Sequence, residues 1–174
     1  MCLMSEPSQL VHIRDAVPGD GDALAEMHAR SRAVYYRAGG HEVAVHPDEE
    51  YRETWRKMVD DPRIAVLVAA IDDDIVGVIT VDAGEVFPTR ASHEKRVRLV
   101  GIFVEPDRWS IGVGGALMAR FVSLARQADA VGEVEVWERN PRAIRFYERH
   151  GWTRDGTSRA GPAGAAYLGY VHLP

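Results

Sequence analysis

The stretch LVGIFVEPDRWSIGVGGALM, residues 99–118, decides the fold of this chain. Its first half is apolar and ends at Pro106, which predicts a strand followed by a turn. Its second half has three glycines, Gly112, Gly114 and Gly115, at the start of a helical pattern. Glycines let the backbone approach a ligand closely, and the first turn of a helix presents unpaired N–H groups at the positive end of its dipole. The stretch therefore predicts an anion site, most often one for phosphate.

Two familiar phosphate motifs do not fit this stretch. A dinucleotide fingerprint needs G-x-G-x-x-G/A directly after the strand. Here the sixth position counted from Gly112 is Leu117, and seven residues separate Val104 from Gly112. A P-loop needs Gly-Lys-Ser/Thr, which the chain lacks. The anion site must therefore belong to another class.

Length and composition indicate one folded domain. The chain has 174 residues, and we expect residues 1–9 to be a disordered tail and residues 10–174 to form a single domain. No apolar run approaches the roughly 18 residues that span a bilayer, and the N-terminus lacks a signal-peptide pattern, so we expect a cytoplasmic protein without a membrane partner. The single cysteine, Cys2, excludes a disulfide framework. The net charge of -5 argues against nucleic-acid binding, which needs a basic face.

Apolar periodicity along the chain predicts the order β-α-α-β-β-β-α-β-α-β-β. A mixed sheet with helices on both faces would bury these apolar stripes, so we expect an α/β fold. Asp72, Asp73 and Asp74 are predicted to form a hairpin turn, Pro47 to be the first residue of the second helix, and Asn140 to cap the last helix. The strands are expected over residues 10–17, 64–71, 75–81, 97–104, 134–137, 152–157 and 166–173.

A second motif, VWERNPRAIRFYERHGW at residues 136–152, begins at the end of the fifth of these strands. It resembles a motif of the GCN5-related N-acetyltransferase (GNAT) superfamily, an Asn at a strand end followed by A-x-x-[F/L]-Y-x-x-x-G-[F/W]. The matching residues are Asn140, Ala143, Phe146, Tyr147, Gly151 and Trp152. The first stretch resembles the family's V-x-P-x-x-[Q/R]-G-x-G-x-G/A motif through Val104, Pro106, Gly112 and Gly114, and it departs from that motif at Trp109 and Ser110. The resemblance covers about residues 10–173.

The resemblance implies the GNAT fold, with a mostly antiparallel sheet, and acetyl transfer from acetyl-CoA to a primary amine of a small molecule or peptide. The glycine loop would hold the pyrophosphate, and pantetheine would lie where the strand before the loop splays from the next one. Tyr147 would be the catalytic acid that protonates the leaving thiolate, although a core position also explains this tyrosine. The residues expected to contact the cofactor are Phe103, Val104, Trp109, Ser110, Ile111, Gly112, Val113, Gly114, Gly115, Asn140, Ala143 and Tyr147.

The sequence leaves the general base open. Many relatives carry a glutamate early in the fourth strand, where this chain has Arg98. Each of the other acidic and histidine residues near the expected site is also explained as solvated surface, and a water chain or a neutral amine would serve equally. These residues are Glu85, His93 and Glu94 before that strand, and His41 and Glu42 between the first two helices. The seven histidines show no metal-ligand spacing, so we expect no metal.

Two other functions stay open at this stage. One is acetylation of a protein N-terminus or lysine, and the other is a non-catalytic module that binds acyl-CoA, which the unusual Trp109-Ser110 pair favours. A homodimer is common in the family. Helical packing explains Tyr35, whereas Tyr36 falls outside the apolar stripe of the first helix and suits an acceptor pocket.

Overall fold

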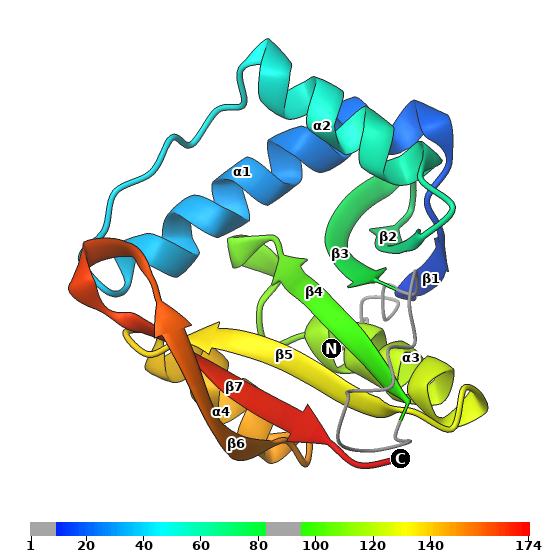
Figure 1. Cartoon of the computed structure of the whole chain (residues 1–174). Helices are drawn as coiled ribbons and strands as arrows, with labels where there is room; N and C mark the ends of the chain where they lie inside the picture. Colours follow the sequence, from blue (N-terminus) through cyan, green and yellow to red (C-terminus); the bar gives the residue numbers. More distant parts are fainter. Residues whose placement is uncertain (1–9, 83–94) are drawn as a thin grey trace, which may run out of the picture.

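The computed structural model describes residues 10–82 and 95–174, which form one seven-stranded sheet with four α-helices (Figure 1). The predicted tail, residues 1–9, lies outside the described residues. The strands are β1 (His12–Asp15), β2 (Ile64–Ile71), β3 (Asp74–Asp82), β4 (Arg96–Val104), β5 (Val131–Trp137), β6 (Thr153–Ala160) and β7 (Ala166–His172). The helices are α1 (Gly21–Arg37), α2 (Glu49–Asp60), α3 (Val113–Gln127) and α4 (Pro141–Arg149). The predicted element order and the α/β class are confirmed.

The sheet consists of two antiparallel blocks that meet at a short parallel contact. Its strand order is β1-β2-β3-β4-β5-β7-β6. Every neighbouring pair is antiparallel except β4 and β5, which pair in parallel over three positions that end at Arg98 opposite Glu133. Beyond this point the two strands diverge (Figure 1). The expected splay is therefore present, and it lies between β4 and β5.

An irregularity in β4 lies at the start of this splay. Gly101 pairs with Thr80 of β3 and Leu99 pairs with Val81, so Val100 has no partner on β3. A bulge of this kind bends a strand and changes the direction of its side chains, and bulges are common beside active sites. The bulge follows Arg98 by two residues.

The helices cover both faces of the sheet (Figure 1). Val66, Val68 and Val78 pack with residues of α1 and α2 in one apolar cluster. Leu67 and Ile79 belong to a second cluster, with residues of α3 and α4. Because side chains alternate along a strand, β2 and β3 are buried on both faces, which explains their nearly continuous apolar sequence.

Some predicted boundaries are wrong by a few residues. Pro47 is not the first residue of α2, because the side chain of Asp48 caps this helix by accepting a hydrogen bond from the N–H of Tyr51 at 2.9 Å. Asp74 belongs to β3 rather than to the turn, and β5 begins at Val131. The other strand ends also shift: β1 is shorter than the predicted strand, and β6 extends to Ala160. In the described ranges, no helix has the length and apolar character that a membrane span requires.

A histidine lies within the packing between α1, α2 and the sheet. The ring of His28 contacts the rings of Tyr51, Trp55 and Phe103, with centroids 5.9, 4.9 and 4.2 Å away. Its Nδ1 also forms a hydrogen bond with the Tyr51 hydroxyl. Burial, reinforced by the positive charge of Arg32, lowers the pKa of His28 to about 3. The ring is therefore neutral in the folded protein at neutral pH.

This depressed pKa predicts a loss of stability in acid. Below about pH 6.5 the unfolded chain protonates His28 and the folded chain does not, so the free energy of unfolding falls by up to about 1.4 kcal/mol per pH unit from about pH 6.5 towards about pH 3. A His28→Phe variant lacks this proton site, and its stability is expected to depend less on pH. Denaturant unfolding at about pH 7 and about pH 4.5 measures the difference, with exposed His12→Gln as the control. Equal pH dependence in His28→Phe and the wild type would contradict the assignment.

Candidate active site

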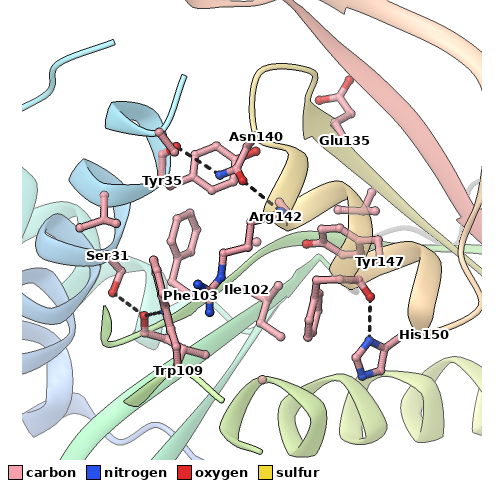
Figure 2. Close-up of a pocket in the computed structure, with 18 of the residues that line it drawn as sticks. Ser31, Tyr35, Ile102, Phe103, Trp109, Glu135, Asn140, Arg142, Tyr147 and His150 are labelled. Atoms are coloured by element: carbon pink, nitrogen blue, oxygen red, sulfur yellow. Dashed lines mark hydrogen bonds between the residues drawn. The ribbon is translucent and has the colours of Figure 1, made fainter. Parts of the chain in front are cut away.

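A cavity of about 870 Å³ opens where β4 and β5 separate (Figure 2). Residues from α1, β4, the glycine loop, α3, β5 and α4 line it, together with residues of β6 and β7. Two segments that are far apart in the chain, the glycine loop and α4, thus face the same space. The glycine loop and the start of α3 line one part of the cavity, and charged and aromatic side chains from the strands line another.

The glycine loop forms one end of the cavity and leads directly into α3. Gly112 precedes the first helical residue, Val113, and has a φ of +94°, which favours glycine. Ser110 also adopts a left-handed conformation, with φ +71°. It therefore takes the conformation of the glycine expected at this position, at a cost of about 1–2 kcal/mol. The first N–H groups of α3 have no partner within the helix, so they remain available to an anion.

Trp109 occupies the position where the resemblance leads one to expect Gln or Arg. Its indole N–H donates to the carbonyl of Val104, the last residue of β4, at 2.9 Å. The hydroxyl of Ser31 on α1 donates to the same carbonyl at 3.1 Å. The guanidinium carbon of Arg142 lies 3.6 Å from the centre of the Trp109 ring (Figure 2). The cation that stacks on Trp109 therefore comes from α4, and Arg108 of the loop also lines the cavity.

Asn140 joins α4 to α1. Its side-chain oxygen accepts the N–H of Ala143 at 3.0 Å, which caps α4 as predicted. Its side-chain nitrogen donates to the carbonyl of Tyr35 at 3.1 Å. The side chain is buried and lines the cavity. Asn140 therefore has a structural role whether or not it also contacts a ligand.

Tyr147 lies on the face of α4 that points into the cavity, and Figure 2 shows its hydroxyl directed there. Only 6% of the residue is exposed. Burial, with a smaller contribution from Tyr35, raises the pKa of Tyr147 well above its usual range. The hydroxyl is therefore protonated at neutral pH, so it suits the role of a proton donor and not that of a base.

Ion pairs line the other end of the cavity. Glu135 of β5 accepts hydrogen bonds from Arg159 of β6, whose Nε lies 2.7 and 2.8 Å from its two oxygens. Nη2 of Arg98 lies 3.1 Å from one of these oxygens. The pKa of Glu135 is lowered, chiefly by the hydrogen bond from Arg159. Tyr36 and Tyr167 also line this end, and their hydroxyls form a hydrogen bond.

All but two of the residues expected to contact the cofactor line this cavity. The ten that do are Phe103, Val104, Trp109, Ser110, Gly112, Gly114, Gly115, Asn140, Ala143 and Tyr147. Ile111 and Val113 do not line the cavity: the side chain of Ile111 is half-exposed, and that of Val113 is buried in the core. Tyr36 also lines the cavity, as its place outside the helical stripe suggested.

Two of the residues considered as a base, His41 and Glu42, lie outside the cavity. The ring of His41 packs against those of Tyr36 and Trp137, and Glu42 pairs with Arg37; neither His41 nor Glu42 lines the cavity. Glu85, His93 and Glu94 lie outside the described residues. Glu135, a carboxylate that does line the cavity, was missed. The signal for it was the alternation of VGEVEVW, which places two glutamates on one face of the strand.

Comparisons with known proteins identify the family of this chain. The model of the Acetyltransferase (GNAT) family matches residues 25–152. The chain is 33% identical over 151 residues to the L-amino acid N-acetyltransferase AaaT of Escherichia coli K12, a match that covers 84% of this chain and 85% of that protein.

Two solved structures illustrate the likeness of fold. The PaiA N-acetyltransferase of Thermoplasma acidophilum in complex with coenzyme A matches with a TM-score of 0.68 and 17% identity, over 92% of this chain and 98% of that one. The ribosomal-protein-S18-alanine N-acetyltransferase of Escherichia coli matches with a TM-score of 0.70 and 16% identity, over 95% of this chain and 94% of that one.

The position of Arg142 predicts a contribution to cofactor binding. Its guanidinium lies beside the glycine loop, and a charge-assisted hydrogen bond to phosphate is strong. We expect Arg142→Leu to raise the Kd of acetyl-CoA roughly tenfold in calorimetric titration. Arg145→Leu is the matched control, because Arg145 lies on the same helix and does not line the cavity. Equal affinities in the two variants would exclude this role.

The conformations of the glycine loop predict opposite effects at two positions. A Cβ atom built on Gly112 meets no atom within 4 Å, so a side chain there is disfavoured by the φ of +94° and not by a clash. We expect Gly112→Val to weaken acetyl-CoA binding, and Ser110→Gly to leave it equal or tighter because it relieves the left-handed serine. Calorimetry measures both, with Gly19→Ala in an open turn as the control. A weaker Ser110→Gly variant would show that the serine side chain itself binds.

Proposed function

Since this chain belongs to the acetyltransferase (GNAT) family and is an N-acetyltransferase, we propose that its acceptor is the α-amino group of a free L-amino acid. One observation carries this proposal: a single cavity connects the start of α3, the Tyr147 hydroxyl and a second end lined by paired charges. The AaaT relative, an L-amino acid N-acetyltransferase, supports the same acceptor class. A cavity of about 870 Å³ has room for a free amino acid.

The donor end suits acetyl-CoA. The N–H groups at the start of α3 and the guanidinium of Arg142 form a positive site for the pyrophosphate. The splayed edges of β4 and β5 offer backbone groups to the amides of pantetheine, in the manner of an added strand. Phe103 and Val104 lie on the β4 side of this gap, and Asn140 and Ala143 lie on the α4 side.

In the proposed reaction the amine attacks the thioester carbonyl directly. A C–N bond forms, the C–S bond breaks, and the Tyr147 hydroxyl gives its proton to the departing thiolate. We place the donor for the developing oxyanion on the backbone of β4 near Val100, where the bulge interrupts pairing with β3. One such N–H group contributes a few kcal/mol to a comparable transition state.

The amine also loses a proton, and Glu135 is a poor acceptor for it. This carboxylate is held by two arginines, and its pKa is lowered, so it has little tendency to take up a proton. We propose that the amine binds in its neutral form and that the proton released after attack passes through water to solvent or to the Tyr147 oxygen. The rate would then rise with pH as more of the amine becomes neutral.

The acceptor class is tested by offering acetyl-CoA with each of the twenty L-amino acids and following the release of CoA thiol. We expect thiol release with some of them, and mass spectrometry should identify the N-acetylated product. Spermidine and a lysine-containing peptide serve as comparison amines. Release with these amines and with none of the amino acids would overturn the proposed acceptor and leave the acetyltransferase activity in place.

The role of Tyr147 gives a separate prediction. Tyr147→Phe keeps the ring and removes the acid, so we expect kcat to fall about 10²–10⁴-fold while the Kd of acetyl-CoA stays nearly unchanged. Steady-state kinetics and calorimetry measure the two quantities. Tyr170→Phe is the control, because Tyr170 is buried on β7 and does not line the cavity. An unchanged kcat in Tyr147→Phe would show that Tyr147 is not the acid.

A further inference from the structure

Three charged residues from three different strands meet at the acceptor end of the cavity. Glu135 lies between two arginines: Nη2 of Arg98 is 3.1 Å from one of its oxygens, and Nη2 of Arg159 is 2.7 Å from the same oxygen. The guanidinium carbon of Arg159 also lies 4.3 Å from the centre of the Tyr167 ring. Arg159 is therefore fixed from two directions, by a carboxylate and by an aromatic face.

The cluster lies at the point where the two central strands separate. Arg98 is the last residue of β4 that pairs with β5, and the bulge at Val100 follows on the same strand. Arg98, Val100 and Glu135 all line the cavity that also contains Tyr147. Figure 2 draws Glu135 and Tyr147 in this one pocket. A ligand bound to the cluster would consequently lie next to the gap in which the thioester is expected.

The charge of the cluster is positive. Two guanidinium groups surround one carboxylate, and each guanidinium has five N–H donors, of which the contacts with Glu135 use only some. Arginine binds carboxylates through paired N–H groups in a fixed geometry. Glu135 itself is already engaged by both arginines, so an ammonium group is a poorer partner for this cluster than a carboxylate is.

The neighbouring ion pair shows that this arrangement is specific to the cavity. Arg96 and Glu133 lie two residues before Arg98 and Glu135 on the same two strands, with Nη1 3.5 Å from Oε2. Neither of them lines the cavity. Among the described residues, a second arginine joins only the pair that faces the cavity, where Arg159 contacts Glu135.

We propose that Arg98 and Arg159 form the site that binds the α-carboxylate of the acceptor, with Glu135 as the positioning residue that orients both guanidinium groups. This inference rests on the proposed amino-acid acceptor, and it specifies that the enzyme recognises the α-carboxylate of that acceptor. The carboxylate held here directs the adjacent α-amine into the splay between β4 and β5. The site then selects amino acids over amines that lack the carboxylate.

The wild-type enzyme provides the first test, which needs no variant. The best acceptor among the twenty L-amino acids is compared with its α-amide and with the amine obtained by removing its carboxyl group. We expect kcat/KM to be at least about tenfold higher for the acid than for either analogue, as for loss of one charge-assisted contact. The amide has the less basic amine and is more often neutral, so intrinsic reactivity works against this result. Equal use of the acid and its amide would overturn the carboxylate site while leaving the amino-acid acceptor intact.

The second test uses variants of the cluster. Arg98→Gln and Arg159→Gln are expected to raise the KM for the amino acid about tenfold or more, and to leave the Kd of acetyl-CoA unchanged. They should also abolish the preference for the acid over its amide. Glu135→Gln is expected to reduce that preference in the same direction, because both guanidinium groups lose their anchor.

Arg96→Gln is the matched control, since it removes a cross-strand ion pair outside the cavity. It should leave both the KM and the preference for the acid unchanged. Unaltered acetyl-CoA binding by the cluster variants shows that they are folded. If they retain the preference for the acid, the carboxylate is bound elsewhere and the proposal is wrong. If the wild type acetylates no amino acid at all, the proposed acceptor is wrong. This result differs from one in which amino acids are acetylated but the carboxylate is not recognised by Arg98 and Arg159.

Discussion

The early end of pairing between β4 and β5 is the constraint on which the rest of the structure depends. Past Arg98 the backbone groups on the facing edges of β4 and β5 need other partners, because a buried and unpaired N–H or C=O group costs about 1–3 kcal/mol. Some partners come from side chains: Trp109 donates to the carbonyl of Val104, and the Tyr35 hydroxyl accepts the N–H of Trp137 at 3.0 Å. The remaining edges face the cavity, where the amides of a bound pantetheine would complete the sheet. The break in the sheet thus opens the cavity that we propose as the binding site.

The distribution of charge follows from what surrounds this break. The chain carries a net charge of -5, yet both ends of the cavity are locally positive. At one end the start of α3 and Arg142 provide the charge, and at the other end two arginines outnumber Glu135. Local fields of this kind determine which ligands are attracted, whatever the net charge of the protein. Tyr147 lines the same cavity, and its burial raises the pKa of its hydroxyl, which keeps its proton at neutral pH.

Features that depend on neighbouring residues could be predicted from the sequence. Asn140 caps α4 and Gly151, with φ +83°, ends it, because caps involve groups only a few residues apart. The element order and the loop before α3 were predictable for the same reason. The start of α2 was predicted wrongly by a few residues: Pro47 was expected as its first residue, whereas Asp48 caps the helix and Glu49 begins it.

The sequence by itself therefore determined the order of strands and helices, the two motifs and the residues that line the donor end. Only the tertiary structure decided how the departures from those motifs are accommodated. Ser110 adopts the glycine conformation because the surrounding loop holds it there, and Trp109 gains its cation from α4. Only the structure showed that Arg98, at the position where many relatives carry a glutamate, pairs with Glu135 of β5, which also pairs with Arg159 of β6. These contacts join segments far apart in the chain, and the splay of the sheet, which no local pattern encodes, brings them together.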